Sequence, residues 1–152
     1  MWFKNVTLFQ LTNPFRLSVA SLEEKLEART ARKCGALELS TLGWSAPLPN
    51  GSGLTLPVGG AILIAAKKEE KILPASVVRE ALNERIAEIE STEGREVRNK
   101  EKQRLRDEIT VELLPRAFTK SRVLHALIDP EQGWLLVDTA SRPRAEEMTV
   151  LL

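Results

Sequence analysis

The chain has 152 residues, of which 43% are hydrophobic and 28% charged, with a net charge of +1. This composition is typical of a globular protein that buries a core, and it excludes a disordered chain. A single cysteine, Cys34, excludes a disulfide framework and favours a reducing compartment, with the thiol as a small half-buried side chain. No apolar run reaches the roughly 18 residues of a membrane helix. We therefore predict a cytoplasmic protein of one domain or little more.

The first 60 residues predict two strands, one helix and a loop. Residues 2–11 and 36–44 are candidate strands. Between them, the spacing of Ser21 and Glu24 predicts a capping box for a polar helix over residues 22–33. Residues 45–60 are rich in Pro, Gly, Ser and Asn and predict a surface loop with little regular structure.

Residues 61–66, "AILIAA", predict a buried strand, and the next segment, "KKEEKILP", brings five charges in a row. Chemistry alone favours a solvated turn here, which returns the chain to the core at residues 72–74. Pro74 then precedes Ser76, a good N-cap for a long helical segment over residues 76–114.

Two apolar stripes run along that helical segment. The first helix has its stripe at helical spacing and breaks at Gly94, and the second runs from about Arg95 to Leu114 and stops at Pro115. The first stripe consists of Val78, Leu82, Ile86 and Ile89, and the second of Val97, Leu105, Ile109 and Leu113.

The last 36 residues predict a hairpin and a helix. Residues 117–128 and 134–139 are candidate strands joined by "DPEQG", and Ser141 can cap a final helix. That helix stops at Leu152 with its apolar face still accumulating, which favours a truncated reading frame or a domain cut from a longer protein. The element order predicts the α+β class, with a largely antiparallel sheet and flanking helices.

Catalytic constellations are largely missing from the sequence. There is no phosphate-binding glycine motif, and one histidine with one cysteine cannot make a usual zinc site. His125 could pair with Ser121 or Ser141, but it lies inside an apolar strand, where a structural role is favoured. The carboxylates do not converge as a magnesium-dependent nuclease requires. We predict no enzyme, no cofactor and no metal.

Cations give a stronger signal. On a helix, Arg95, Arg98, Lys102 and Arg106 would lie along one side, and strand alternation puts Lys120, Arg122 and Phe118 on one face. Such rows suit contact with a nucleic-acid backbone regardless of sequence. The alternative is a solvated helix whose cations pair locally with Glu101 and Glu108.

Several segments resemble the RdgC family of bacterial recombination-associated DNA-binding proteins, in the family's order and over essentially the whole chain. They are "WFKN" (2–5), Gly43-Trp44, "KKEEKILP" (67–74), "LLPRAF" (113–118) and "GWLLVDTASRPRAEEM" (133–148). Family members are about twice this length, so the resemblance identifies residues 1–152 as the N-terminal half, with the C-terminal half absent.

The resemblance implies a function without catalysis. RdgC-like proteins form a ring-shaped homodimer around double-stranded DNA with little sequence preference, act at the nucleoid, and restrain the RecA recombinase. The four helical cations would then line the ring, with Lys67 and Lys68 as further candidates, and Phe118 matches a position of the dimer contact. The alternatives are a protein-interaction module that binds RecA or dimerises, and a nuclease.

Overall fold

The computed structural model describes residues 3–152, so Trp2 of the "WFKN" segment lies outside the described residues. The chain divides into two compact units, each described by itself. The sheet unit contains described residues 3–32, Thr41–Glu69 and Ser121–Leu152, and the hairpin unit contains Lys33–Ser40 and Glu70–Lys120. Strands β4 (Ala61–Ile72) and β5 (Phe118–Asp129) contribute residues to both units.

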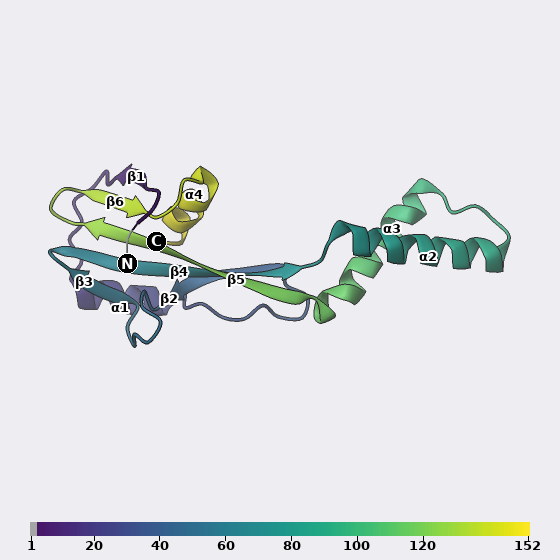
Figure 1. Ribbon diagram of the computed structural model, residues 1–152, viewed down its shortest axis with the longest axis horizontal. Helices are drawn as coiled ribbons and strands as arrows, with labels where there is room; N and C mark the ends of the chain where they lie inside the picture. Colours follow the sequence, from purple (N-terminus) through teal and green to yellow (C-terminus); the bar gives the residue numbers. More distant parts are fainter. Residues whose placement is uncertain (1–2) are drawn as a thin grey trace. The chain divides into compact units, whose positions relative to one another are not determined.

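An antiparallel sheet confirms the predicted α+β class (Figure 1). Within residues 3–152, six strands form one sheet in the order β1-β6-β5-β4-β2, and β3 pairs with β4. The β1–β6, β5–β6 and β3–β4 pairs are antiparallel. The remaining strands are β1 (Thr7–Gln10), β2 (Ser40–Ser45), β3 (Thr55–Val58) and β6 (Trp134–Val137).

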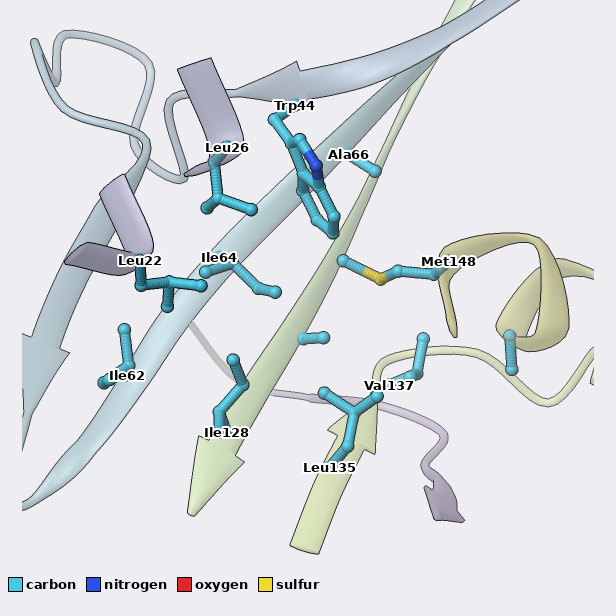
Figure 2. Close-up of a cluster of buried hydrophobic side chains, with 12 residues drawn as sticks. Leu22, Leu26, Trp44, Ile62, Ile64, Ala66, Ile128, Leu135, Val137 and Met148 are labelled. Atoms are coloured by element: carbon cyan, nitrogen blue, oxygen red, sulfur yellow. The ribbon is translucent and has the colours of Figure 1, made fainter. Parts of the chain in front are cut away.

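The core of the sheet unit lies on one face of the sheet, under helices α1 (Val19–Glu27) and α4 (Arg142–Leu151). Alternation along the strands sends every second side chain to this face, as with Ile62 and Ile64 of β4. Figure 2 shows Leu22 and Leu26 of α1 and Met148 of α4 pointing into the same cluster as Trp44. The inward orientation predicted for Leu22 and Leu26 is confirmed.

Helix α1 is shorter than predicted and has a different cap. The cap is Ser18, whose hydroxyl accepts a hydrogen bond from the Ser21 amide at 3.1 Å, so the predicted capping box at Ser21 is wrong. The helix ends at Glu27 because the following backbone pairs with β2 instead. The Ala31 amide donates to the Trp44 carbonyl at 2.7 Å, and the Trp44 amide donates to the Arg29 carbonyl at 2.8 Å.

This pairing explains the Gly43-Trp44 dipeptide. A Cβ atom on Gly43 would lie 2.6 Å from the Ala31 backbone nitrogen, a distance that side-chain carbons do not adopt. Gly43 therefore permits the close backbone approach, and Trp44, 2% exposed, fills the core beside it.

Residues 45–60 were predicted to have little regular structure, and they contain one short strand that the sequence did not reveal. Thr55–Val58 form β3, with Thr55 opposite Ile64 and Pro57 opposite Ile62 of β4. The composition concealed this strand because Pro and Gly usually mark loops. Here β3 pairs only with β4, and proline is tolerated on an edge strand.

The prediction of a turn at "KKEEKILP" is also wrong. Strand β4 continues through the charged residues and ends at Ile72. Its neighbours β5 and β2 pair with it in the sheet and satisfy backbone groups that a turn would leave to water. Glu69 is buried, and its carboxylate accepts from the Ser121 hydroxyl at 3.3 Å.

The hairpin unit contains helices α2 (Ala75–Glu93) and α3 (Asn99–Leu113), followed by a 3₁₀ turn at Leu114–Arg116. Gly94 ends α2 in the left-handed conformation (φ 62°), which confirms the predicted break. The N-cap of α2 is Pro74, so the predicted cap at Ser76 is wrong. Both predicted apolar stripes pack together around Leu82, Val97, Leu105 and Ile109.

The C-terminal elements confirm the predicted hairpin and final helix. Strands β5 and β6 pair with Ala126 opposite Val137, and Gly133 (φ 70°) completes their turn. Ser141 occupies the N-cap position of α4. No helix of the described chain is long and apolar enough to cross a membrane.

Candidate nucleic-acid interface

The predicted row of four cations is not one helical row. Helix α3 begins at Asn99, with Arg98 in an extended conformation at its N-cap, so Arg95 and Arg98 precede the helix. The extended start is imposed by Val97, whose side chain is buried and whose amide donates to the Glu90 carboxylate at 3.0 Å. Of the predicted row, only Lys102 and Arg106 lie within α3.

Arg95 is held by carboxylates. Its two terminal nitrogens donate to Glu101 at 2.8 Å each, and its Nε donates to Glu93. These hydrogen bonds, Glu101 first, raise the pKa of the Arg95 guanidinium, and the bond from Arg95 lowers the pKa of Glu101. The pair ties the interhelical segment to α3 and leaves Arg95 poorly placed to neutralise a phosphate.

Three cations at the start of α3 line a shallow surface hollow together with Gln103, Glu101 and Asp107. We call Arg98, Lys100 and Arg104 the outer cluster. Among residues 3–152, Arg98 and Lys100 have no carboxylate in salt-bridge range, and the partner of Arg104 is Glu108 at 3.4 Å in an exposed pair. The prediction missed Lys100 and Arg104, although their i,i+4 spacing places them on one face.

Arg106 belongs to a different surface. With Lys71 and Arg79 it borders a groove whose apolar lining includes Leu39, Leu73 and Val78. We call Lys71, Arg79 and Arg106 the groove cluster. No carboxylate lines this groove, within the part of the chain that the structure describes. Of the predicted row, Arg98 thus lies in the outer cluster and Arg106 in the groove cluster, while Arg95 and Lys102 belong to neither.

The cations of α3 occupy its less favourable end. Lys100 and Lys102 lie in the first turn, where the partial positive charge of the helix terminus repels cations, and Asp107, Glu108 and Glu112 lie in the second half of the helix. Each misplaced charge costs about 0.3–1 kcal/mol at an exposed site. Helix stability therefore does not account for this distribution.

The predicted cations of the sheet unit are engaged or partly buried. Lys67 lies 3.5 Å from Glu69, and Lys68 pairs with Glu147 at 2.6 Å. Arg122 is half-buried and lines a hollow with Lys68 beside α4. These three side chains do not form an exposed row.

Two further predicted residues lie in the hairpin unit. Lys120 is exposed, and Phe118, at the start of β5, is 84% exposed. Because a large aromatic side chain that is open to water can bury much apolar area against a partner, Phe118 is a candidate contact residue.

The residues considered for catalysis do not form a site. The Nε2 atom of His125 donates to the Pro47 carbonyl at 3.0 Å, which supports the predicted structural role. The α3 carboxylates are engaged, Asp107 by Gln103 at 3.1 Å and Glu108 by Arg104. No group of three or more His, Cys, Asp or Glu residues within 3–152 is arranged to hold a metal ion.

Residues 1–152 match the family described as "Putative exonuclease, RdgC". Three similar proteins, all named recombination-associated protein RdgC, come from Shewanella denitrificans (46% identity), Aeromonas hydrophila (44%) and Haemophilus influenzae (44%). Each match covers 100% of this chain and 50% of the relative. The chain thus spans about half the length of these curated relatives.

Proposed function

Because the chain belongs to the RdgC family, we propose that it binds double-stranded DNA without sequence preference, through the outer cluster of the hairpin unit. Arg98, Lys100 and Arg104 face water on one surface of the hairpin unit, as contacts to successive phosphates require. By its family, the protein acts in recombination.

The observation that carries this proposal is the concentration of exposed cations near the N-terminal end of α3, where Arg98 and Lys100 have no carboxylate in salt-bridge range among residues 3–152. Their position opposes the helix dipole, so the helix itself does not favour them. A polyanion bound there would offset that cost, since phosphates are favoured at a helix N-terminus by the dipole and by the cations alike. The helix dipole and the cations would then both attract the phosphate.

We propose binding without strand cleavage, although the family description includes the words putative exonuclease. Glu101, Asp107 and Glu108 each hydrogen-bond or pair with a neighbouring side chain, and that arrangement supports a surface that binds phosphate. Release of nucleotides from duplex DNA in the presence of Mg²⁺, abolished by substitution of these carboxylates, would contradict this part of the proposal.

Binding of this protein along duplex DNA would also affect recombination. A protein bound along duplex DNA denies that duplex to the RecA recombinase, and we propose that this restrains strand exchange at the nucleoid. Strand exchange by RecA should then fall with added protein in proportion to the fraction of duplex bound. Inhibition that persists with a variant unable to bind DNA would indicate a direct contact with RecA instead.

The decisive experiment is titration of a labelled random-sequence duplex, followed by fluorescence anisotropy at several salt concentrations. We expect the triple variant Arg98→Glu, Lys100→Glu, Arg104→Glu to bind at least about a hundredfold more weakly. The slope of log affinity against log salt should also fall by about 0.9 for every phosphate that the variant fails to neutralise.

A matched control has the same change in net charge. The variant Arg16→Glu, Lys25→Glu, Arg142→Glu reverses three exposed cations of the sheet unit, and we expect it to reduce affinity far less. A third variant reverses Lys71, Arg79 and Arg106, and its expected effect is intermediate because the apolar groove lining is less suited to phosphate. Equal losses of affinity in all three variants would mean that binding depends on net charge alone.

The exposure of Phe118 favours a second function, a homodimer contact. Burial of this side chain against a partner would stabilise a dimer by about 2 kcal/mol. Light scattering should then show dimers that Phe118→Ala disperses and Val111→Ala, at another exposed apolar side chain of the hairpin unit, leaves intact. A monomer at high concentration would contradict this function without affecting the DNA proposal.

A further inference from the structure

Within residues 3–152, the second face of the sheet in the sheet unit carries no helix. It is largely apolar over β1, β6, β3 and the adjoining parts of β5 and β4, and further along those two strands it carries His125, Lys67 and Glu69. Helices α1 and α4 pack on the core face, so the alternate side chains of the strands point to the other side. The register places Leu8 of β1 beside Leu136 of β6, and Leu136 beside Leu127 of β5. On the same face, Leu63 of β4 lies beside Leu56 of β3. We call this surface the open face.

Leucines on the open face occupy positions that water-facing strands usually give to polar residues. An antiparallel sheet with one solvated face alternates apolar and polar side chains. Here Leu8 is 58% exposed, while Leu136 and Leu127 are half-buried. A contiguous apolar surface of this kind on a folded protein marks a place where another protein segment binds.

The open face is hollowed at one end. Leu63 and Leu127 form the floor of a depression, and side chains from outside the sheet and from β3 form its rim. The lining residues are Phe3, Leu48, Leu56, Val58, Leu63 and Leu127. Leu63 is 7% exposed, so the depression is recessed below the rim. The fitting occupant is a segment with protruding apolar side chains.

A second copy of this chain is the competing occupant. In two-fold pairing, the hollow at one end of the open face would meet the other end of the partner's open face. Interfaces that hold proteins together are packed as densely as protein interiors. The occupant must therefore fill the hollow with protruding apolar side chains.

The comparisons provide such an occupant. The matched relatives are about twice the length of this chain, and the match covers 100% of it and half of each relative. We propose that the open face is the docking surface for the polypeptide that corresponds to the second half of the family chain, whether it is joined to this one or separate, and that apolar side chains of that half enter the hollow. This proposal does not depend on DNA binding.

The test uses this chain co-expressed with the second half of the Aeromonas hydrophila relative as a separate, tagged polypeptide. We expect the two to co-purify as a one-to-one complex. The variant Leu8→Lys, Leu136→Lys should weaken the complex by at least about a hundredfold, because a buried leucine contributes roughly tenfold or more to affinity. Val150→Lys on α4, at an 80% exposed apolar residue, is the control and should leave the complex intact.

Each outcome decides the proposal. Circular dichroism establishes that the variants are folded, and if the double variant is not, Leu8→Lys alone serves because its site is already open to water. Where the second half is insoluble by itself, its recovery in the soluble fraction with the wild-type chain, but not with the variant, is the supporting result. Absence of a complex, or equal binding by wild type and variant, overturns the proposal. A homodimer of this chain that Leu136→Lys disperses overturns it in favour of a second copy.

Discussion

The sheet unit and the hairpin unit are built in different ways. In the described residues, the main core of the sheet unit joins twelve buried side chains from both helices and several strands, which are far apart in sequence. The hairpin unit has a buried cluster of four, Leu82, Val97, Leu105 and Ile109, all within 28 consecutive residues. Neither of its helices has a side-chain hydrogen bond at its N-cap.

This difference indicates that stability depends mainly on the sheet unit and binding mainly on the hairpin unit. The sheet unit buries enough apolar surface to determine the fold, and the hairpin unit, with its small local core, should open at a lower free energy. The outer cluster and the groove cluster both belong to the hairpin unit. Charge changes there should alter binding with little effect on folding, whereas core changes in the sheet unit should affect the whole protein.

Trp44→Ala should have the largest effect on stability. It removes a 2% exposed indole from the larger core and leaves a cavity between α1 and the sheet, at a cost of about 3–5 kcal/mol. Urea denaturation followed by circular dichroism measures the loss of stability. Trp134→Ala, at a 36% exposed residue, is the control and should cost much less. Comparable losses would mean that the core does not determine stability.

Leu105→Ala tests the weaker unit. Its side chain is 5% exposed in the four-residue cluster, and its truncation should cost about 2–3 kcal/mol. Hydrogen exchange should show faster exchange in α2 and α3, while β5 and β6 keep their protection. Uniform acceleration through both units would show that they unfold as one cooperative body.

Glu23→Gln should have a smaller, pH-dependent effect in the sheet unit. Burial raises the pKa of Glu23, but hydrogen bonds from the Thr55 hydroxyl and from the Leu54 and Thr55 amides outweigh it, and the pKa is lowered. A carboxylate with a lowered pKa stabilises the fold above its unfolded pKa of about 4.5, and the contribution is lost as the pH falls through its folded pKa.

We therefore expect Glu23→Gln to cost about 1 kcal/mol at pH 7 and the difference from wild type to vanish in acid. Urea titrations from pH 7 to pH 3 measure it, and Glu24→Gln, at the exposed neighbouring residue, is the control. A difference that stays constant over this range would show that the charge of Glu23 is not involved.

Glu101→Gln should have the smallest effect on folding. The ion pair with Arg95 is exposed, and such pairs contribute little because water screens them. We expect no resolvable change in the urea midpoint. We do expect tighter duplex binding, since the substitution removes an acid beside the outer cluster and releases Arg95. Weaker binding would indicate that Arg95 must be held in place for DNA contact.

Periodicity was sufficient to predict much of this molecule. The stripe through Val78 and Leu82, the inward leucines of α1, and the β5–β6 hairpin follow from local patterns, because side-chain spacing reflects which face an element buries. The resemblance to the RdgC family also lay in the sequence, in short segments such as "KKEEKILP".

Tertiary pairing determined the rest. The charged residues of "KKEEKILP" form a strand because β5 and β2 satisfy the backbone of β4, and helix α3 starts at Asn99 because Glu90 binds the Val97 amide. Strands β5 and β2 are distant in sequence from the charged segment of β4. Glu90 lies outside the helical spacing that predicted the row of cations. The first pairing made a predicted turn part of β4, and the second left Arg95 and Arg98 outside the helix that contains Lys102 and Arg106. The open face also depends on tertiary pairing, because the register of β1 with β6 and of β6 with β5 places their leucines side by side.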